Sequence, residues 1–273
     1  MKLYEWGRRG DPALLYWDGV GGTGLHANEI GPILAGEHGL HVIAPDPPGH
    51  GASAAGDPDS FRPTRLAQAA AELLSELAID RAAFLGFSWG GRVGVWLAAR
   101  YPERLTALAL VEGGHQGAYP QTGLQAAVEE ARAEREEETF DGWEAYFAYE
   151  RQSLRRWTAA LEEAHRAVMR EENGRVAPIA SAEVVGAIYH GSRLEPLADA
   201  YPAIAAAGVP VLLLVAADSA TEAVARFRAA LPAARVEAVP NAIHDLISFA
   251  PERIAGAVGS FVAEHLGTGQ PPP

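Results

Sequence analysis

The chain has 273 residues and contains no cysteine and only one lysine, Lys2. Without thiols, disulfide bonds, thiolate catalysis and cysteine-ligated metal sites are excluded. The sequence also lacks any apolar run of the ~18 residues that a membrane span requires. Its first residues lack the apolar centre of a signal peptide. We therefore expect a cytoplasmic protein with no membrane partner.

Positive charge is scarce as well. Lysine and arginine together number 22 against 35 aspartates and glutamates, so the formal net charge is −13. This balance disfavours a nucleic-acid partner, because phosphates would be repelled. The glycine-rich stretch 19–24 has neither the Lys-Ser/Thr pair of a P-loop nor dinucleotide-binding spacing. We expect a small-molecule substrate, with no cofactor and no metal, and leave open a homo-oligomer.

Short apolar runs alternate with longer helical patterns along most of the chain. This alternation predicts an α/β fold, in which helices cover both faces of a mostly parallel central sheet. The expected strands are 13–17, 41–44, 81–85, 105–111, 211–215 and 235–239, and the expected helices are 63–77, 92–100 and 251–265.

Residues 119–199 interrupt this alternation. They hold no convincing strand, and aromatic residues are interleaved with charged ones. We predict a helical insertion that acts as a lid over a core made of residues 1–118 and 200–267, followed by a disordered tail, 268–273. We interpret most of the aromatics as helix packing; the alternative is that a few of them roof a pocket.

The most informative motif is G-x-S-x-G, centred on Ser88, between an expected strand and an expected helix. A serine in this context sits on a tight, strained strand-to-helix turn that exposes its hydroxyl at a helix N-terminus. Developing negative charge is favoured at that place. The alternative is an idle serine in a glycine-rich connection.

At this point the chain resembles the α/β-hydrolase fold family, nearly end to end outside the insertion. The resemblance is carried by the segments 18–22 (DGVGG), 44–53 (APDPPGHGAS), 86–90 (GFSWG), 101–105 (YPERL), 244–245 (HD) and 250–252 (APE). It implies that Ser88 is the nucleophile and His244 the base, and that the backbone N–H groups of Val20 and Trp89 form the oxyanion hole. The family usually has His-Gly where this chain has Asp18-Gly19.

The resemblance leaves two places for the acid that orients the imidazole. After strand 211–215 the usual register falls on Ser219, which cannot carry the charge, and Asp218 is one residue early. Glu112 directly follows strand 105–111, where some dehalogenase-like relatives hold their acid. We favour Glu112, keep Asp218 as the alternative, and rank Asp245 last because side chains adjacent in sequence rarely meet.

We expect three other histidines to have no catalytic role. His26 and His115 are expected to be pocket or rim residues, and His50 belongs to a loop whose role in the family is usually structural. The resemblance implies a serine hydrolase that cleaves a small, largely uncharged ester or lactone through an acyl-enzyme on Ser88. The alternatives are carbon–carbon bond, amide or perhydrolase chemistry on the same residues, or a non-catalytic ligand-binding protein.

Overall fold

A seven-stranded sheet lies at the centre of the computed structural model, which describes residues 1–117, 120–154, 156–218 and 221–266. The strands are β1 (Leu3–Trp6), β2 (Ala13–Trp17), β3 (His41–Pro45), β4 (Ala82–Phe87), β5 (Leu105–Val111), β8 (Val211–Ala216) and β9 (Arg235–Val239). Their order is β1-β3-β2-β4-β5-β8-β9, and only β1 runs antiparallel to its neighbour. The predicted mostly parallel sheet is confirmed, and the expected tail 268–273 lies outside the described residues.

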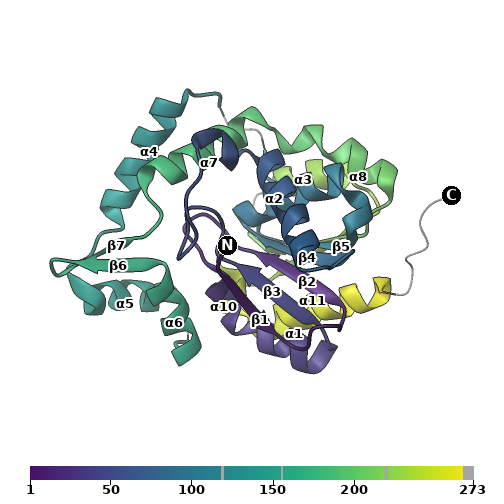
Figure 1. Ribbon diagram of the computed structural model, residues 1–273, viewed down its shortest axis with the longest axis horizontal. Coiled ribbons are helices and arrows are strands. Elements are labelled where there is room, and N and C mark those ends of the chain that lie inside the picture. The colour runs from purple at the N-terminus through teal and green to yellow at the C-terminus, as the bar shows by residue number, and fades with distance from the viewer. Residues whose placement is uncertain (118–119, 155, 219–220, 267–273) are drawn as a thin grey trace.

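Helices cover both faces of this sheet (Figure 1). One face is covered by α1 (Ile30–His38), α10 (Leu246–Phe249) and α11 (Pro251–His265), and the other by α2 (Pro63–Glu76), α3 (Trp89–Arg100), α8 (Tyr201–Ala207) and α9 (Thr221–Ala230). Side chains alternate between the faces along β2, so that Leu14 packs with the first group and Leu15 with the second. Because both faces are covered, the central strands read as unbroken apolar runs. No helix in the described part of the chain is long and apolar enough to cross a membrane.

Several core elements were not predicted from the sequence, namely strand β1 and helices α1, α8, α9 and α10; β1 and α1 show why. Strand β1 is a four-residue edge strand whose residues are only partly buried or exposed, so it shows no apolar run. Helix α1 contains two glycines and a proline within nine residues, which hides its helical pattern. Both lie at the side of the sheet away from the Ser88 motif and leave the prediction of the site unaffected.

The insertion between β5 and β8 extends away from the sheet on the left of Figure 1. It contains α4 (Leu124–Glu137), α5 (Gly142–Ser153), α6 (Ala159–Ala167), β6 (Met169–Glu172), β7 (Arg175–Pro178) and α7 (Ala182–Leu194). The expectation that it holds no strand was wrong, because β6 and β7 pair as an antiparallel hairpin. Its turn is Asn173-Gly174, both with positive φ, which is the two-residue signal for a hairpin that the sequence analysis passed over.

The aromatic side chains of the insertion pack mainly on one another. The ring centroid of Phe147 lies 5.6 Å from that of Trp143 and 5.6 Å from that of Trp157. Tyr146 and Met169 are buried in the same cluster. This arrangement supports helix packing, rather than a pocket roof, as the role of these aromatics.

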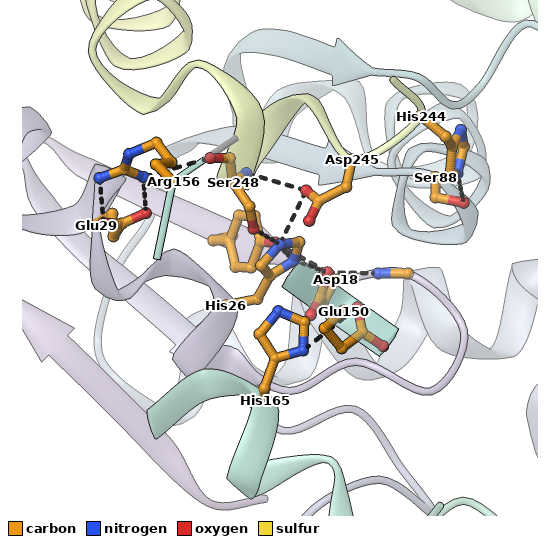
Figure 2. A network of polar contacts seen from close by, with 12 residues as sticks. Asp18, His26, Glu29, Ser88, Glu150, Arg156, His165, His244, Asp245 and Ser248 are labelled. Carbon is orange, nitrogen blue, oxygen red and sulfur yellow. Dashed lines mark hydrogen bonds and ion pairs between the residues drawn. The ribbon is translucent and has the colours of Figure 1, made fainter. Parts of the chain in front are cut away.

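Polar contacts join the insertion to the core at Glu29. The guanidinium of Arg156 forms a two-pronged ion pair with the carboxylate of Glu29, which directly precedes α1. The hydroxyl of Thr158 donates to the same carboxylate over 2.8 Å. Two side chains of the insertion therefore converge on one carboxylate of the core (Figure 2 draws the Arg156 pair).

Glu150, on α5, makes the stability of the insertion depend on pH. Burial, together with the charges of Asp245 and Glu138, raises the pKa of Glu150 from 4.5 to about 7. The folded protein therefore holds this proton more tightly than the unfolded chain. This contribution to stability is complete below about pH 4.5 and is lost as the pH rises through about 7.

We predict that Glu150→Gln raises the Tm at pH 8 by roughly 2–4 °C and leaves it nearly unchanged at pH 5. The amide cannot ionise, so the cost of burying a charge disappears at the higher pH only. Thermal unfolding at the two pH values measures the difference. Glu144→Gln, an exposed position on the same helix, is the control and should show no such pH dependence. A larger loss of stability at pH 8 than at pH 5 would contradict the assignment.

Candidate active site

Ser88 occupies a strained turn between β4 and α3. Its backbone angles are φ 50° and ψ −115°, outside the regions that L-residues favour. Glycine is required on both sides: a Cβ at Gly86 would lie 2.5 Å from the carbonyl oxygen of Gly90, and one at Gly90 would collide with the carbonyl oxygen of Trp17. The turn places the Ser88 side chain at the first turn of α3, at the carboxyl edge of the sheet.

His244 lies beside this serine, although 156 residues separate them in the sequence. Its Nε2 is 3.0 Å from the Ser88 Oγ, a contact drawn in Figure 2. Its Nδ1 is 3.1 Å from Oε2 of Glu112. Both distances are hydrogen bonds, so the imidazole joins a hydroxyl on one side to a carboxylate on the other. The structure brings together the three residues that the sequence analysis favoured.

Glu112 lies buried directly after the end of β5. It is 4% exposed and has a positive φ of 48°. Its second carboxylate oxygen, Oε1, accepts a hydrogen bond of 2.6 Å from the backbone N–H of Ala216, at the end of β8. Neighbouring parallel strands end at the same edge of the sheet, and the loop that carries His244 follows β9 at that edge. The Glu112 carboxylate is therefore close enough to contact His244. Asp218, in contrast, is exposed in the turn after β8.

The loop after β2 runs close to the nucleophile. A Cβ on Gly19 would lie 3.2 Å from the Cβ of Ser88. Val20 and Trp89 line the same cavity as Ser88. Trp89 is the first residue of α3, where backbone N–H groups have no acceptor within the helix. Both residues expected at the oxyanion hole thus border the reactive hydroxyl.

A cavity of about 370 Å³ opens at Ser88, between the core and the insertion. Its lining comes from the core (Val20, Ser88, Trp89, Arg92, Gln116), from α4 (Glu130, Glu134) and from α7 (Ile188, Tyr189, Ser192, Arg193). The two arginines and the two glutamates make the lining formally neutral. The carboxylate of Glu130 pairs with Arg193 over 2.6 Å, and that of Glu134 accepts from the Tyr189 hydroxyl over 2.7 Å.

Sequence reasoning missed most of this lining. Arg92 carried a signal, because a residue four positions after Ser88 on a helix lies on the same face. The residues from α4 and α7 carried none, since their position depends on how the insertion packs against the core. Arg92 is buried, and its Nη1 donates to the carbonyl oxygens of Ser192 and Glu195 at 3.4 and 3.3 Å.

His26 and His115 do not line this cavity, so their expected role as pocket or rim residues was wrong. His115 is buried beneath the site, and burial lowers its pKa. His26 contacts Asp18 and Asp245 instead (Figure 2). His50 is buried and stacks on the indole of Trp89 with ring centroids 5.6 Å apart, which fits the structural role expected of it. Its Nδ1 donates to the carbonyl oxygen of Pro48.

Asp245 is engaged away from His244. Its Oδ1 accepts from the backbone N–H of Ser248 over 3.0 Å and caps α10. The same oxygen lies 3.1 Å from Nε2 of His26. Within the described residues, no cluster of three or more histidine, aspartate or glutamate side chains is arranged to hold a metal ion.

Curated proteins share parts of this sequence. An uncharacterized hydrolase of Saccharomyces cerevisiae is 32% identical over 109 residues, which are 40% of this chain and 37% of that protein. A 2-hydroxy-6-oxo-6-phenylhexa-2,4-dienoate hydrolase of Burkholderia cepacia is 37% identical over 100 residues, 37% of this chain and 34% of the relative. The chain thus spans about a third of the length of these relatives.

Solved structures resemble the chain over nearly its whole length. E-2-(acetamidomethylene)succinate hydrolase superposes with a TM-score of 0.74 and 22% identity, covering 96% of this chain and 94% of the other. The enol-lactonase of Burkholderia xenovorans LB400 gives 0.70 and 22%, covering 96% of both. The family model described as alpha/beta hydrolase fold matches residues 12–251. The sheet, the strained turn and this match agree: the chain belongs to the α/β-hydrolase fold family.

Proposed function

We propose that this protein is a serine hydrolase that cleaves a small, largely uncharged carboxylic ester or lactone. The observation that carries the proposal is the pair of contacts made by His244, 3.0 Å to the Ser88 hydroxyl and 3.1 Å to the Glu112 carboxylate. A serine hydroxyl is a weak nucleophile until a neighbouring base removes its proton. An imidazole held by a carboxylate supplies that base.

The proposed reaction has two halves. The Ser88 Oγ forms a bond to the acyl carbon while His244 takes its proton, and that proton then passes to the departing alkoxide. Glu112 keeps the imidazole oriented and stabilises the imidazolium. In the second half, His244 takes a proton from water, which attacks the acyl carbon. The carbon–Oγ bond then breaks, the proton passes from His244 to the Ser88 Oγ, and the acid is released. The backbone N–H groups of Val20 and Trp89 hold the oxyanion in both halves.

The lining of the cavity supports an uncharged substrate. Its two arginines are balanced by two glutamates, and Glu130 is already paired with Arg193. A formally neutral but polar lining suits ester or lactone oxygens better than a highly charged molecule. We propose further that residues 119–199 serve as a lid, because α4 and α7 supply six of the residues that line the cavity.

A second candidate substrate class is an oxo-dienoate. The local similarity to the dienoate hydrolase of Burkholderia cepacia favours it. Such a substrate carries a carboxylate, which Arg92 would attract if the cavity binds it. The same Ser88, His244 and Glu112 would then cleave a carbon–carbon bond. Comparing turnover of acyl esters, lactones and an oxo-dienoate by the purified protein separates the two classes.

We predict that a fluorophosphonate probe labels Ser88 of the protein at neutral pH and that p-nitrophenyl esters of short acids are hydrolysed. The probe reacts readily only with a serine whose proton is removed by a neighbouring base. Mass spectrometry of the adduct and release of p-nitrophenol are the measurements. Ser88→Ala is the control and should show neither. An absent adduct, or ester hydrolysis that persists in Ser88→Ala, would favour a non-catalytic ligand-binding protein or another site.

We predict that Glu112→Gln lowers kcat roughly 100-fold or more, whereas Asp218→Asn changes it less than about 3-fold. The amide lacks the charge that stabilises the imidazolium, while Asp218 lies exposed beyond β8. Steady-state kinetics on one ester measure both variants, with thermal unfolding to verify that each is folded. The opposite ranking would transfer the acid's role to Asp218.

A further inference from the structure

A second histidine, His26, lies between the two loops that carry the proposed machinery. Its Nδ1 is 2.9 Å from Oδ1 of Asp18, and its Nε2 is 3.1 Å from Oδ1 of Asp245 (Figure 2). Asp18 directly precedes the oxyanion loop, Gly19-Val20, and its Oδ1 also accepts from the backbone N–H of Gly19 over 2.8 Å. Asp245 directly follows His244. One imidazole thus joins the start of the oxyanion loop to the residue beside the base.

The arrangement of acceptors calls for a charged ring. A neutral imidazole has one N–H, whereas each nitrogen of His26 faces a carboxylate, so only the imidazolium donates to both. Burial lowers the pKa of His26, but the charges of Asp18 and Asp245 outweigh it and hold the pKa well above 6.5. In turn, His26 outweighs the burial of Asp245 and holds the pKa of that carboxyl well below 3.8. With two carboxylates and one imidazolium, the cluster has a formal charge of −1.

Other polar groups surround this cluster. The hydroxyl of Tyr16, on β2, donates to Asp18, and the Ser248 hydroxyl lies 3.0 Å from Nε2 of His26. From the insertion, His165 on α6 and Glu150 on α5 face it. Burial, with a smaller effect of the charge on His26, lowers the pKa of His165 to about 4, so this ring is neutral at pH 7. The charge on His26 is thus opposed mainly by its two aspartates.

Phe87 supplies a second connection. The His26 ring packs edge-on against it, with centroids 5.2 Å apart, and the His244 ring lies against it at 5.4 Å. Phe87 directly precedes Ser88. If His26 moved, Phe87 would lose a packing contact, and the position of the adjacent Ser88 turn would be affected. This effect would add to the effect of the lost charge.

We propose that His26 is a positioning residue, which fixes the oxyanion loop and the His244 loop relative to each other through Asp18 and Asp245. The inference rests on the proposed function, since it assigns those loops their roles. His26 touches no substrate in this account; it acts through the two carboxylates. Losing it frees two loops whose separation sets how the transition state is held.

The test is His26→Gln. We expect kcat to fall roughly 10- to 100-fold with KM changed less than about 3-fold, because the oxyanion donors and the base lose their alignment. We also expect the acidic limb of the kcat/KM profile to move up by roughly half a pH unit. Without the imidazolium, two unbalanced carboxylates favour the protonated form of His244.

A matched control separates positioning from stability. His41 is another buried histidine in contact with a carboxylate, Glu5, over 2.7 Å, at the far edge of the sheet. His41→Gln should lower the Tm and leave kcat and the pH profile unchanged. The double variant His26→Gln/Asp245→Asn restores the formal charge of −1. The double variant should fold, since asparagine can still cap α10. The acidic limb should return to its original position, while kcat stays low because His26 is still absent.

A folded His26→Gln enzyme with unchanged kcat and unchanged pH profile, or an equal pH shift in His41→Gln, overturns the proposal. If His26→Gln does not fold, Asp18→Asn takes its place and should lower kcat in the same way. Failure of the wild-type protein to react with fluorophosphonate would instead count against the proposed function. In that case the titration of His244, followed by NMR in the wild type and in His26→Gln, still measures the predicted shift without a substrate.

Discussion

The hydrogen bond between His244 and Ser88 is the contact on which this account depends, and the fold is arranged to make it. The serine is fixed by a backbone turn that only flanking glycines permit. The imidazole arrives from a loop 156 residues later in the chain. Glu112 limits the rotation of the ring from the end of β5. Each group is carried by the carboxyl edge of a parallel sheet, where loops from separate strands converge.

Much of the core was predictable because its signals are local. The strands at 105–111 and 235–239 and the helix at 251–265 coincide with the observed elements. The first of these strands is buried and reads as a nearly unbroken apolar run, and the helix begins at a proline. Ser88 was found because its turn needs glycine at fixed spacing. Glu112 was found because a carboxylate placed directly after seven strand residues must lie at the edge of the sheet.

The remainder depends on how distant segments meet, which local patterns do not record. The hairpin β6–β7 was missed because its strands are short and charged, although Asn173-Gly174 marked its turn. The residues on α4 and α7 line the cavity only because the insertion brings these two helices beside the core residues around Ser88. The sequence predicts His26 as a pocket or rim residue, but it contacts Asp18 and Asp245 instead. These partners lie 8 and 219 positions away, so sequence proximity suggested neither.

The most direct measurement is a crystal structure of the enzyme after reaction with an alkyl phosphonate. We expect a covalent bond from the Ser88 Oγ to phosphorus. One phosphoryl oxygen should lie within about 3 Å of the backbone nitrogens of both Val20 and Trp89. His244 should keep its contact with Glu112 in that complex. A phosphonate on another residue, or a phosphoryl oxygen turned away from both nitrogens, would contradict the central claim.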